Sequence, residues 1–318
     1  MKPGEFDLIA RLARAAAKGS GTGVAIGIGD DAAVLEPRPG CELVSCIDTL
    51  VSDVHYPAST PAPAVGHKAL AVNLSDLAAM GAVPRWALLS LALPAPSADW
   101  LDGFAEGFFK LAGRHGVSLT GGDTVATTGP AVISVQVLGE VPAGEALTRA
   151  QAQPGDQVAV TGTLGGAALA LKKVLAGEVP EPGLRQLLDR PEPRVAAGLE
   201  LRGLASAAID LSDGLASDLK RLADASGVAI EVDVPRLPLH PELAGQSNLL
   251  PLALSGGDDY ELCFCLPSRH EDKTKAALAA LGLPMTIIGS VAAGSGLAWR
   301  TAEGAPLEVA DGYEHFGS

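Results

Sequence analysis

Gly27-Ile28-Gly29-Asp30-Asp31-Ala32-Ala33-Val34 is the stretch around which we expect the chain to be organised. It places two adjacent carboxylates, Asp30 and Asp31, between glycines and a short apolar run. Glycine lets the backbone turn tightly and approach a ligand closely, and neighbouring carboxylates repel each other unless a cation lies between them. A hard cation such as Mg²⁺ prefers these oxygen ligands. Alone, the stretch fits an exposed acidic turn as well as it fits a cation-binding loop.

Further carboxylates follow predicted strands or lie in glycine turns, and they favour the cation-binding interpretation. They are Asp48 after the strand predicted over 42–47, Asp123 in Gly121-Gly122-Asp123, Asp210 and Asp213 on either side of Leu211-Ser212, and the pair Asp258-Asp259 after Gly256-Gly257. In layered α/β proteins the ends of strands converge on one edge, where ligands bind. Because a cluster of unneutralised carboxylates is costly, two or more Mg²⁺ ions that bridge a polyphosphate would relieve it.

A helix predicted over 61–80 contains Asn73, Ser75 and Asp76 among apolar neighbours. The side chains of Asn, Ser and Asp compete for backbone hydrogen bonds within a helix, and an acid opposes the helix dipole near the C-terminus. A solvated polar face is the plainer interpretation, but the apolar residues between them leave little room for one. Because residues that break a local rule together often mark a site, we include Asp76 among the candidate ligands.

The composition is that of a globular protein with two domains. The chain has 318 residues, of which 47% are apolar, so it can fill two ordinary cores. Its formal net charge is −14 and its Lys and Arg residues are scattered, which excludes the basic face of a general nucleic-acid-binding protein. An acidic protein can still act on phosphates, because bound cations can bridge the protein and the phosphate.

The sequence predicts a soluble, cytoplasmic protein without a membrane partner. No apolar run approaches the ~20 residues of a membrane span, and Glu5 and Asp7 stand where a signal peptide would be basic and then apolar. The four cysteines, at positions 41, 46, 263 and 265, form no C-x-x-C motif. We therefore expect reduced thiols, with neither a zinc site nor a disulfide framework.

Helices and strands are predicted in both halves of the chain. In the first half, helices are expected over 5–18, 61–80 and 99–115, and strands over 42–47, 85–93, 117–120 and 131–141. In the second half, strands are expected over 157–161, 207–210, 229–234, 262–266 and 285–288, and helices over 167–176, up to about 204, from 215 and over 270–281. Two Pro-Gly-containing stretches at 142–144 and 153–156 bracket a connection, so we place the domains at 1–142 and 143–318.

Motifs that the sequence lacks narrow the chemistry. It contains no Walker lysine loop, no kinase catalytic loop and no Ser-His-Asp signature. A general base is unnecessary where the attacking group is a phosphate oxygen, because phosphoryl transfer depends mainly on positioning and charge neutralisation. The residues therefore predict a metal-dependent enzyme that acts on phosphates. Two features also have a purely structural interpretation. Asp213 fits a helix N-cap. The glycine turn at 162–166 lacks the spacing of a phosphate loop, so we expect a plain turn there.

Together, the motifs resemble those of the thiamine-monophosphate kinase family, which belongs with aminoimidazole ribonucleotide synthetase and selenophosphate synthetase to one superfamily. The resemblance runs nearly end to end and rests on the stretches 4–6, 27–31, 48–51, 68–81, 121–123, 146–149, 209–214, 255–262 and 312–316. It implies ATP-dependent phosphorylation of thiamine monophosphate to thiamine diphosphate, the final step of thiamine diphosphate biosynthesis, by direct in-line, Mg²⁺-assisted transfer.

The resemblance also implies a fold and an assembly. The expected fold class is α+β, with two mixed α/β domains. The N-terminal domain would bind ATP and Mg²⁺, and its sheet would form the interface of a homodimer. The C-terminal domain, an α/β sandwich, would complete the active site.

Each matched residue has an implied role. The magnesium ligands would be Asp31, Asp48, Asp76, Asp123, Asp210 and Asp213, of which Asp210, Asp31 and Asp76 would also be catalytic. The ATP contacts would be Gly121, Gly122, Arg149 and Ser212, and the contacts to thiamine monophosphate would be His55, Asp258 and Tyr313. An arginine fork suits a phosphate, and an aromatic ring suits a cationic thiazolium. As alternatives, His55 is a surface loop residue and Tyr313 only packs the tail.

Two positions depart from the family pattern. Cys46-Ile47 stands where the family often has Ser-Thr, which removes two side-chain oxygens near Asp48. Asp258 stands where the family often has Glu, whose side chain is one methylene longer.

Two other functions stay open. One is another ATP-dependent enzyme of the superfamily, of the cyclo-ligase or selenophosphate synthetase type. The second of these types is disfavoured, because its reactive cysteine lies near the N-terminus and the first cysteine here is Cys41. The other function is a non-catalytic regulator that binds Mg²⁺ and a nucleotide.

Overall fold

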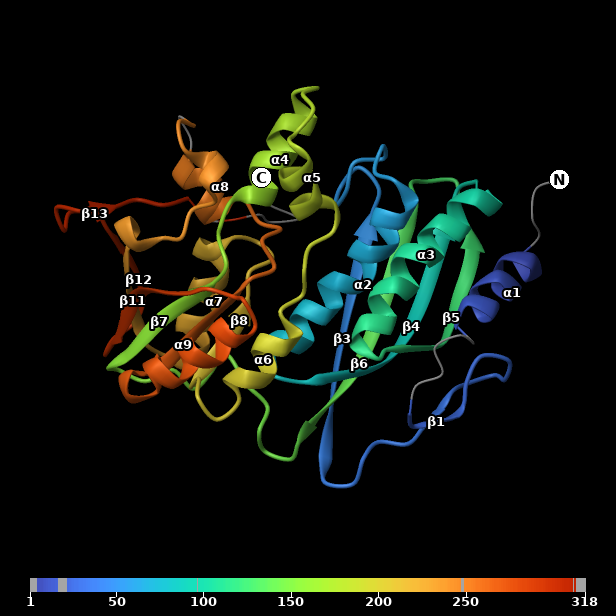
Figure 1. Ribbon diagram of the computed structural model, residues 1–318, viewed down its shortest axis with the longest axis horizontal. Helices are drawn as coiled ribbons and strands as arrows, with labels where there is room; N and C mark the ends of the chain where they lie inside the picture. Colours follow the sequence, from blue (N-terminus) through green and yellow to red (C-terminus); the bar gives the residue numbers. More distant parts are fainter. Residues whose placement is uncertain (1–4, 17–21, 96, 247–248, 311, 313–318) are drawn as a thin grey trace. The chain divides into compact units, whose positions relative to one another are not determined.

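The computed structural model describes residues 5–16, 22–95, 97–246, 249–310 and 312 (Figure 1). The chain forms two compact units, one made of Met1–Leu77 with Ala82–Gly144 and the other of Ala78–Gly81 with Glu145–Ser318. Each unit combines helices with a mixed sheet. The predicted α+β class with two mixed α/β parts is therefore confirmed.

A four-stranded sheet is the framework of the first unit. Its order is β3-β6-β4-β5, with β4 and β5 parallel and the other pairs antiparallel. The strands are β3 (Cys41–Val51), β4 (Val83–Leu93), β5 (Ser118–Ala126) and β6 (Val132–Pro142), and a separate ribbon pairs β1 (Val24–Ile26) with β2 (Val34–Leu35). The helices are α1 (Glu5–Ala16), α2 (Ala62–Ala79) and α3 (Ala98–His115), and Figure 1 shows α2 and α3 over one face of the sheet.

Strand β6 shows which face of this sheet the helices cover. Its residues alternate as predicted, with Val135 and Val137 buried and Gln136 half-buried. Val137 lies opposite Cys46 of β3, and the Cys46 thiol contacts Asn73 of α2. Because side chains at paired positions point to the same side, the apolar positions of β6 face the helices. Gln136 therefore belongs to the opposite, open face.

Glycines let α2 and α3 pack closely over this sheet. A Cβ atom at Gly66 would overlap the carbonyl oxygen of Phe104, and one at Gly107 would overlap that of Pro63. The two helix backbones therefore touch where they cross. This contact fixes α2, which contains Asn73, Ser75 and Asp76, against α3.

A seven-stranded sheet is the framework of the second unit. Its order is β13-β12-β9-β11-β7-β10-β8, with β12 parallel to β9 and the other pairs antiparallel. The strands are β7 (Asp156–Thr161), β8 (Ala207–Asp210), β9 (Ala229–Asp233), β10 (Leu262–Pro267), β11 (Met285–Ala292), β12 (Gly296–Arg300) and β13 (Pro306–Leu307). The helices are α4 (Gly166–Leu175), α5 (Pro182–Asp189), α6 (Val195–Leu201), α7 (Leu215–Ser226), α8 (Leu249–Ser255) and α9 (Glu271–Ala280).

Two strands of the first unit are longer than predicted. Strand β3 pairs with β6 along its whole length, up to Val51 opposite Val132, so Asp48 lies inside a strand and not at its end. Strand β5 continues to Ala126, so the Gly121–Asp123 motif lies within a strand and not in a turn after it. The continuous backbone pairing with the neighbouring strands explains both differences, because each ladder carries the chain past the polar residues.

Four elements of the second unit were not predicted from local patterns. They are the helices α5 and α8 and the strands β12 and β13. None of the described helices is long and apolar enough to cross a membrane. All four cysteines are free thiols, two of them buried in β10.

Candidate active site

On the helix-covered face of the first sheet, the buried amide of Asn73 links α2 to β3. Its Oδ1 accepts a hydrogen bond from the backbone N–H of Asp48 at 3.1 Å, and its Nδ2 donates to the carbonyl of Ala69 at 3.2 Å. Burial, and then the charges of Asp76 and Asp48, raise the pKa of the Cys46 thiol. The two predicted ligands Asp48 and Asp76 therefore lie close to the same thiol, and Asn73 does not belong to a solvated face.

The open face of the same sheet lines a cavity of about 740 Å³. The predicted residues Asp31, Gly121, Gly122 and Asp123 all contribute to its lining. Gly122 approaches β4 so closely that a Cβ atom there would overlap the carbonyl oxygen of Leu89. The structure thus brings the glycine–acid loop and the Gly-Gly-Asp motif to one hollow.

Small polar side chains cross the sheet beside this cavity in one row. Asp123 of β5 lies opposite Ser90 of β4, and Ser90 lies opposite Ser134 of β6. The hydroxyl oxygens of Ser134 and Thr49 of β3 are 2.7 Å apart. The floor of the cavity therefore offers hydroxyl and carboxylate oxygens next to the backbone of Gly122.

The four predicted ligands of the first unit form two pairs. Asp31 and Asp123 line the cavity, whereas Asp48 and Asp76 lie on the helix-covered face. In the part of the chain that the structure describes, no three His, Cys, Asp or Glu side chains form a group that could hold a metal ion. The assignment of these acids as magnesium ligands stays a prediction.

In the second unit, one edge of the sheet brings two motifs together. Strand β8 ends at Asp210, which lies opposite Leu262 at the start of β10. The backbone N–H of Asp258 donates to the carbonyl of Ser212 at 2.9 Å, and that of Tyr260 donates to the carbonyl of Leu211 at 2.8 Å. The loop before β10 is therefore fastened onto the loop after β8.

These hydrogen bonds hold the backbone of Asp258 and Tyr260 in an unusual conformation. Asp258 and Tyr260 have φ angles of 63° and 49°, in the left-handed region that residues other than glycine seldom adopt. Such conformations persist only where the surroundings enforce them, and they concentrate at functional sites. The position of Asp258, a predicted contact to thiamine monophosphate, is thus fixed by the loop that follows Asp210 and contains Ser212.

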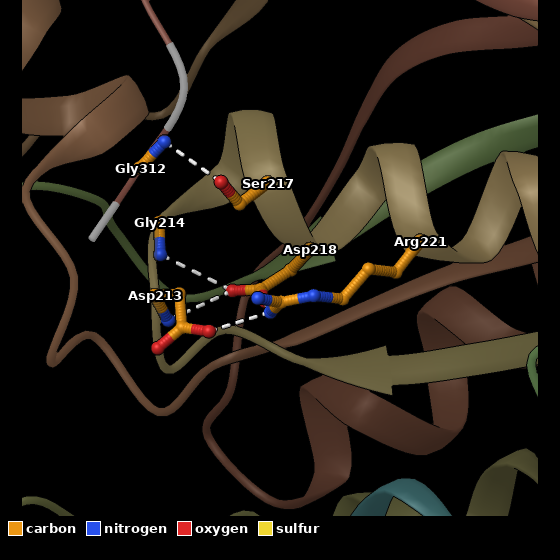
Figure 2. Close-up of polar contacts among 6 residues, drawn as sticks. All are labelled: Asp213, Gly214, Ser217, Asp218, Arg221 and Gly312. Carbon is orange, nitrogen blue, oxygen red and sulfur yellow. Dashed lines mark hydrogen bonds and ion pairs between the residues drawn. The ribbon is translucent and has the colours of Figure 1, made fainter. Parts of the chain in front are cut away.

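Asp213 is held by two residues that the sequence analysis did not single out, Asp218 and Arg221 (Figure 2). Asp218 is 1% exposed, and it accepts hydrogen bonds from the backbone N–H groups of Asp213 and Gly214. Arg221 donates to both carboxylates, at 2.5 Å to Asp213 and 2.7 Å to Asp218. Burial, and then the charges of Asp213 and Asp210, raise the pKa of Asp218 to about 7.

Asp259 contacts the glycine turn at 162–166, before α4, for which a plain turn was predicted rather than a phosphate loop. Its Oδ1 accepts a hydrogen bond from the backbone N–H of Gly165 at 2.9 Å, so this amide at the start of the helix already has a carboxylate partner. Burial raises the pKa of Asp259 well above its usual range, and the charges of Glu261 and Asp258 act in the same direction. The turn is therefore joined to the loop that contains Asp258.

The remaining predicted contacts lie on separate elements. His55 is half-buried in the turn after β3, where its Nδ1 accepts from the backbone N–H of Val51 at 2.9 Å. Arg149 is exposed, and its carbonyl accepts from the hydroxyl of Ser226 at 2.6 Å. Tyr313 lies outside the described residues. Its neighbour Gly312 donates its backbone N–H to Ser217 of α7 at 2.7 Å (Figure 2).

The edge of the second sheet fits a divalent cation. The carboxylates of Asp210, Asp213 and Asp218 lie near one another at this edge, where Arg221 pairs with Asp213 and Asp218, so these three acids outnumber the paired guanidinium. Carboxylate oxygens are the donors that Mg²⁺ prefers. Asp210 and Asp213 are therefore suited to hold such an ion.

Two domain families match the chain in succession. The N-terminal domain of AIR synthase related proteins matches residues 29–141, and the C-terminal domain matches residues 153–300. The fold and the acidic edge therefore define a two-domain protein of the AIR synthase related class.

Relatives within this class identify the family. The chain is 42% identical to a thiamine-monophosphate kinase of Salmonella typhimurium, over 100% of both chains. It is similar to the crystal structure of thiamine-monophosphate kinase from Stenotrophomonas maltophilia K279a, with 45% identity and a TM-score of 0.86 over 94% of this chain and 97% of that one. It is also similar to AaThiL complexed with AMPPCP and TMP, with 34% identity and a TM-score of 0.79 over 98% and 97%. The chain belongs to the thiamine-monophosphate kinase family.

Proposed function

We propose that the chain transfers the γ-phosphoryl group of ATP to thiamine monophosphate, giving thiamine diphosphate and ADP. The observation that supports this most strongly is the relationship to AaThiL, a protein complexed with AMPPCP and TMP, over 98% of this chain. AMPPCP is an analogue of ATP, so that relative combines a nucleotide with the phosphorylated acceptor. The relatives of 38% and 42% identity over nearly the full length are also thiamine-monophosphate kinases.

We propose further that the acids of both units act on the phosphates through Mg²⁺. When bound, Mg²⁺ would neutralise phosphate charge and orient the groups for in-line transfer. In the first unit, Asp31 and Asp123 lie at the cavity, next to the glycine backbone that we assign to ATP. In the second unit, Asp210 stands at the end of β8, where the pairing with Leu262 fixes its backbone.

No general base is required in this reaction. The acceptor oxygen belongs to a phosphate that is ionised at neutral pH, so the chain needs only to position it. We assign this positioning to His55, Asp258 and Tyr313. The exposed guanidinium of Arg149 would bind a phosphate of ATP, because its planar fork matches two oxygens, and Ser212 would be a further ATP contact.

We also propose a homodimer that forms through the open face of the first sheet. Leu43 and Ile47 on this face of β3 are 51% and 65% exposed, and Val125 on β5 is 47% exposed. Large apolar side chains that stay exposed on an open sheet face are suited to an interaction surface. Sedimentation of the wild type and of Ile47→Glu tests this proposal, since a buried charge would dissociate the dimer. In this arrangement the N-terminal domain binds nucleotide and dimerises, and the C-terminal domain completes the site.

The test of the function is a product assay with matched acceptors. Purified chain, ATP and Mg²⁺ are incubated with thiamine monophosphate, thiamine or no acceptor, and ADP and thiamine diphosphate are separated by chromatography. We expect equal amounts of both products, only with thiamine monophosphate and only with Mg²⁺ present. ATP binding by calorimetry without turnover of thiamine monophosphate would instead indicate a nucleotide-binding regulator and would contradict the proposal.

A further inference from the structure

Asp218 is a buried acid that the proposed chemistry does not use. It lies in the first turn of α7, and its Oδ2 accepts from the backbone N–H groups of Asp213 at 3.0 Å and Gly214 at 3.2 Å. These are the last two residues before the helix, so one carboxylate oxygen fixes the turn from β8 into α7. Gly214 has a φ angle of 112°, and an added Cβ atom would lie 2.9 Å from the carbonyl oxygen of Leu254. The turn is therefore tightly determined.

Arg221 binds the carboxylates of both Asp213 and Asp218. One turn further along α7, its Nη1 donates to Oδ1 of Asp218 at 2.7 Å and to Oδ2 of Asp213 at 2.5 Å (Figure 2). Asp213 is thus held twice, at its backbone by Asp218 and at its carboxylate by Arg221. Both supports come from the same helix, so they keep a constant spacing.

The two supports differ in their freedom to move. The side chain of Asp218 is 2% exposed, whereas that of Arg221 is 47% exposed. If Asp218 moved away, it would leave two backbone N–H groups without their partner, which is costly. Arg221 can move away from Asp213 and keep its charge hydrated, because the side chains of that pair are 47% and 31% exposed. Asp218 is therefore the fixed support and Arg221 the exchangeable one.

We propose that Asp218 and Arg221 are positioning residues for Asp213, with Asp218 fixing the turn and Arg221 acting as an exchangeable counter-ion that a divalent cation displaces. The inference rests on the proposed function, which makes Asp213 a cation ligand. A cation on the Asp213 carboxylate would stand next to the guanidinium, and two positive charges at one carboxylate repel each other. Cation binding and the Arg221–Asp213 ion pair therefore compete.

Binding of Mn²⁺ to the full chain without nucleotide tests the exchange, with free Mn²⁺ measured by electron paramagnetic resonance. Arg221→Gln removes the competitor, so we expect the Kd for Mn²⁺ to fall about fivefold, the loss of one partly exposed ion pair. The matched control is Lys220→Gln, which removes one positive charge from the same helix and breaks an exposed pair with Asp224, at 2.6 Å. Arg221→Lys keeps the charge and should stay near the wild type.

Asp218→Asn tests the fixed support. Its amide oxygen can still accept from the two backbone N–H groups, but its NH₂ group would face the guanidinium of Arg221 and no charge is left to hold it. The support of Asp213 therefore weakens, and the Kd for Mn²⁺ should rise about tenfold. The two variants therefore shift the same affinity in opposite directions, which a general loss of structure would not do. If Asp218→Asn does not fold, Arg221→Gln and its control still decide the exchange.

Each part of this proposal is contradicted by a different result. An Arg221→Gln variant that binds Mn²⁺ no more tightly than Lys220→Gln overturns the counter-ion role, and an Asp218→Asn variant with wild-type affinity overturns the fixed support. A wild-type chain that does not phosphorylate thiamine monophosphate contradicts the proposed function itself. An active wild type whose variants show no opposite shifts contradicts only the present inference.

Discussion

Arg194 and Glu261 form a two-point ion pair next to the loop that presents Asp258. The Nε of Arg194 donates to Oε2 of Glu261 at 2.8 Å, and its Nη2 donates to Oε1. The hydroxyl of Thr161 donates to the same carboxylate at 2.6 Å, and Glu261 is 4% exposed. The backbone carbonyl of Glu261 accepts from the N–H of Leu211, so this buried network supports the edge of the sheet where Asp210 lies.

We expect Arg194→Met to destabilise the protein strongly. The substitution leaves the carboxylate of Glu261 buried without its counter-ion, which typically costs about 3 kcal/mol or more of unfolding free energy. The matched control is Arg300→Met, which breaks a pair with Glu231 whose side chains are 39% and 52% exposed and should cost less than about 1 kcal/mol. Denaturant unfolding of both variants measures the difference. Equal losses in the two would show that the Arg194–Glu261 pair is not a main support.

Asp210→Asn should remove most turnover while the fold persists. The amide matches the carboxylate in shape but is a poor ligand for a hard cation, and loss of one such charge typically lowers kcat about 100-fold or more. Asp233→Asn is the control, because Asp233 is an acid of the same sheet that pairs with Arg236 at the surface. Steady-state kinetics and thermal unfolding check both variants. Near-normal turnover in Asp210→Asn would refute its role.

Local patterns in the sequence predicted much of this fold. The alternation in β6 follows from one covered and one open sheet face, and glycine next to carboxylates marked the loops at Asp31, Asp213 and Asp258. The ends of β3 and β5 were predicted too early in the sequence. Backbone pairing with a neighbouring strand keeps polar residues such as Asp48 within the strand, and local sequence patterns do not show this pairing. Strand β12 was not predicted, since its parallel partner β9 lies far away in the sequence.

The supports of the site were harder to predict than its ligands. Arg194 and Glu261 are 67 residues apart, and no local pattern relates them. Asp218 did leave a signal: it lies on the same side of α7 as the buried Leu215 and Leu222, and an acid within an apolar helix face is unusual. Sequence patterns show which side chains are chemically suited to a site, whereas tertiary contacts decide what holds them.

Gly122→Ala should destabilise the first unit and weaken its predicted ATP contact. The added Cβ atom would overlap the carbonyl oxygen of Leu89, so β5 must move away from β4 at a cost of about 2 kcal/mol. Gly113→Ala is the control, since an added Cβ atom there meets no atom within 4 Å and alanine favours the helix by up to ~1 kcal/mol. The two glycine variants should thus shift the unfolding free energy in opposite directions, and only Gly122→Ala should raise the KM for ATP. An unchanged stability of Gly122→Ala would show that the strands can separate at no cost.

The stability of the first unit should fall in acid, and Glu140 should account for part of the loss. Glu140 is 1% exposed and accepts from the Nε atoms of Arg38 at 2.6 Å and Arg85 at 2.9 Å. Burial opposes its ionisation, but the hydrogen bonds from Arg38 and Arg85 outweigh burial and lower the pKa of Glu140 below its ordinary value of 4.5. The unfolded chain therefore takes up this proton first as the pH falls. The stabilisation that ionised Glu140 gives to the fold is complete above pH 4.5, and it disappears as the pH drops through the lower pKa of Glu140 in the folded state.

Glu140→Gln separates this contribution from general acid unfolding. At neutral pH the variant leaves the exposed Arg38 and the partly buried Arg85 without their shared carboxylate, and we expect a loss of about 2 kcal/mol. Between neutral pH and about pH 3, the wild type should lose more unfolding free energy than the variant, because only the wild type has this carboxylate to protonate. Denaturant titrations at both pH values measure the two losses, with Glu303→Gln at an exposed position as the control. If acidification destabilises the wild type and Glu140→Gln equally, the lowered pKa of Glu140 does not contribute to the acid sensitivity of the fold.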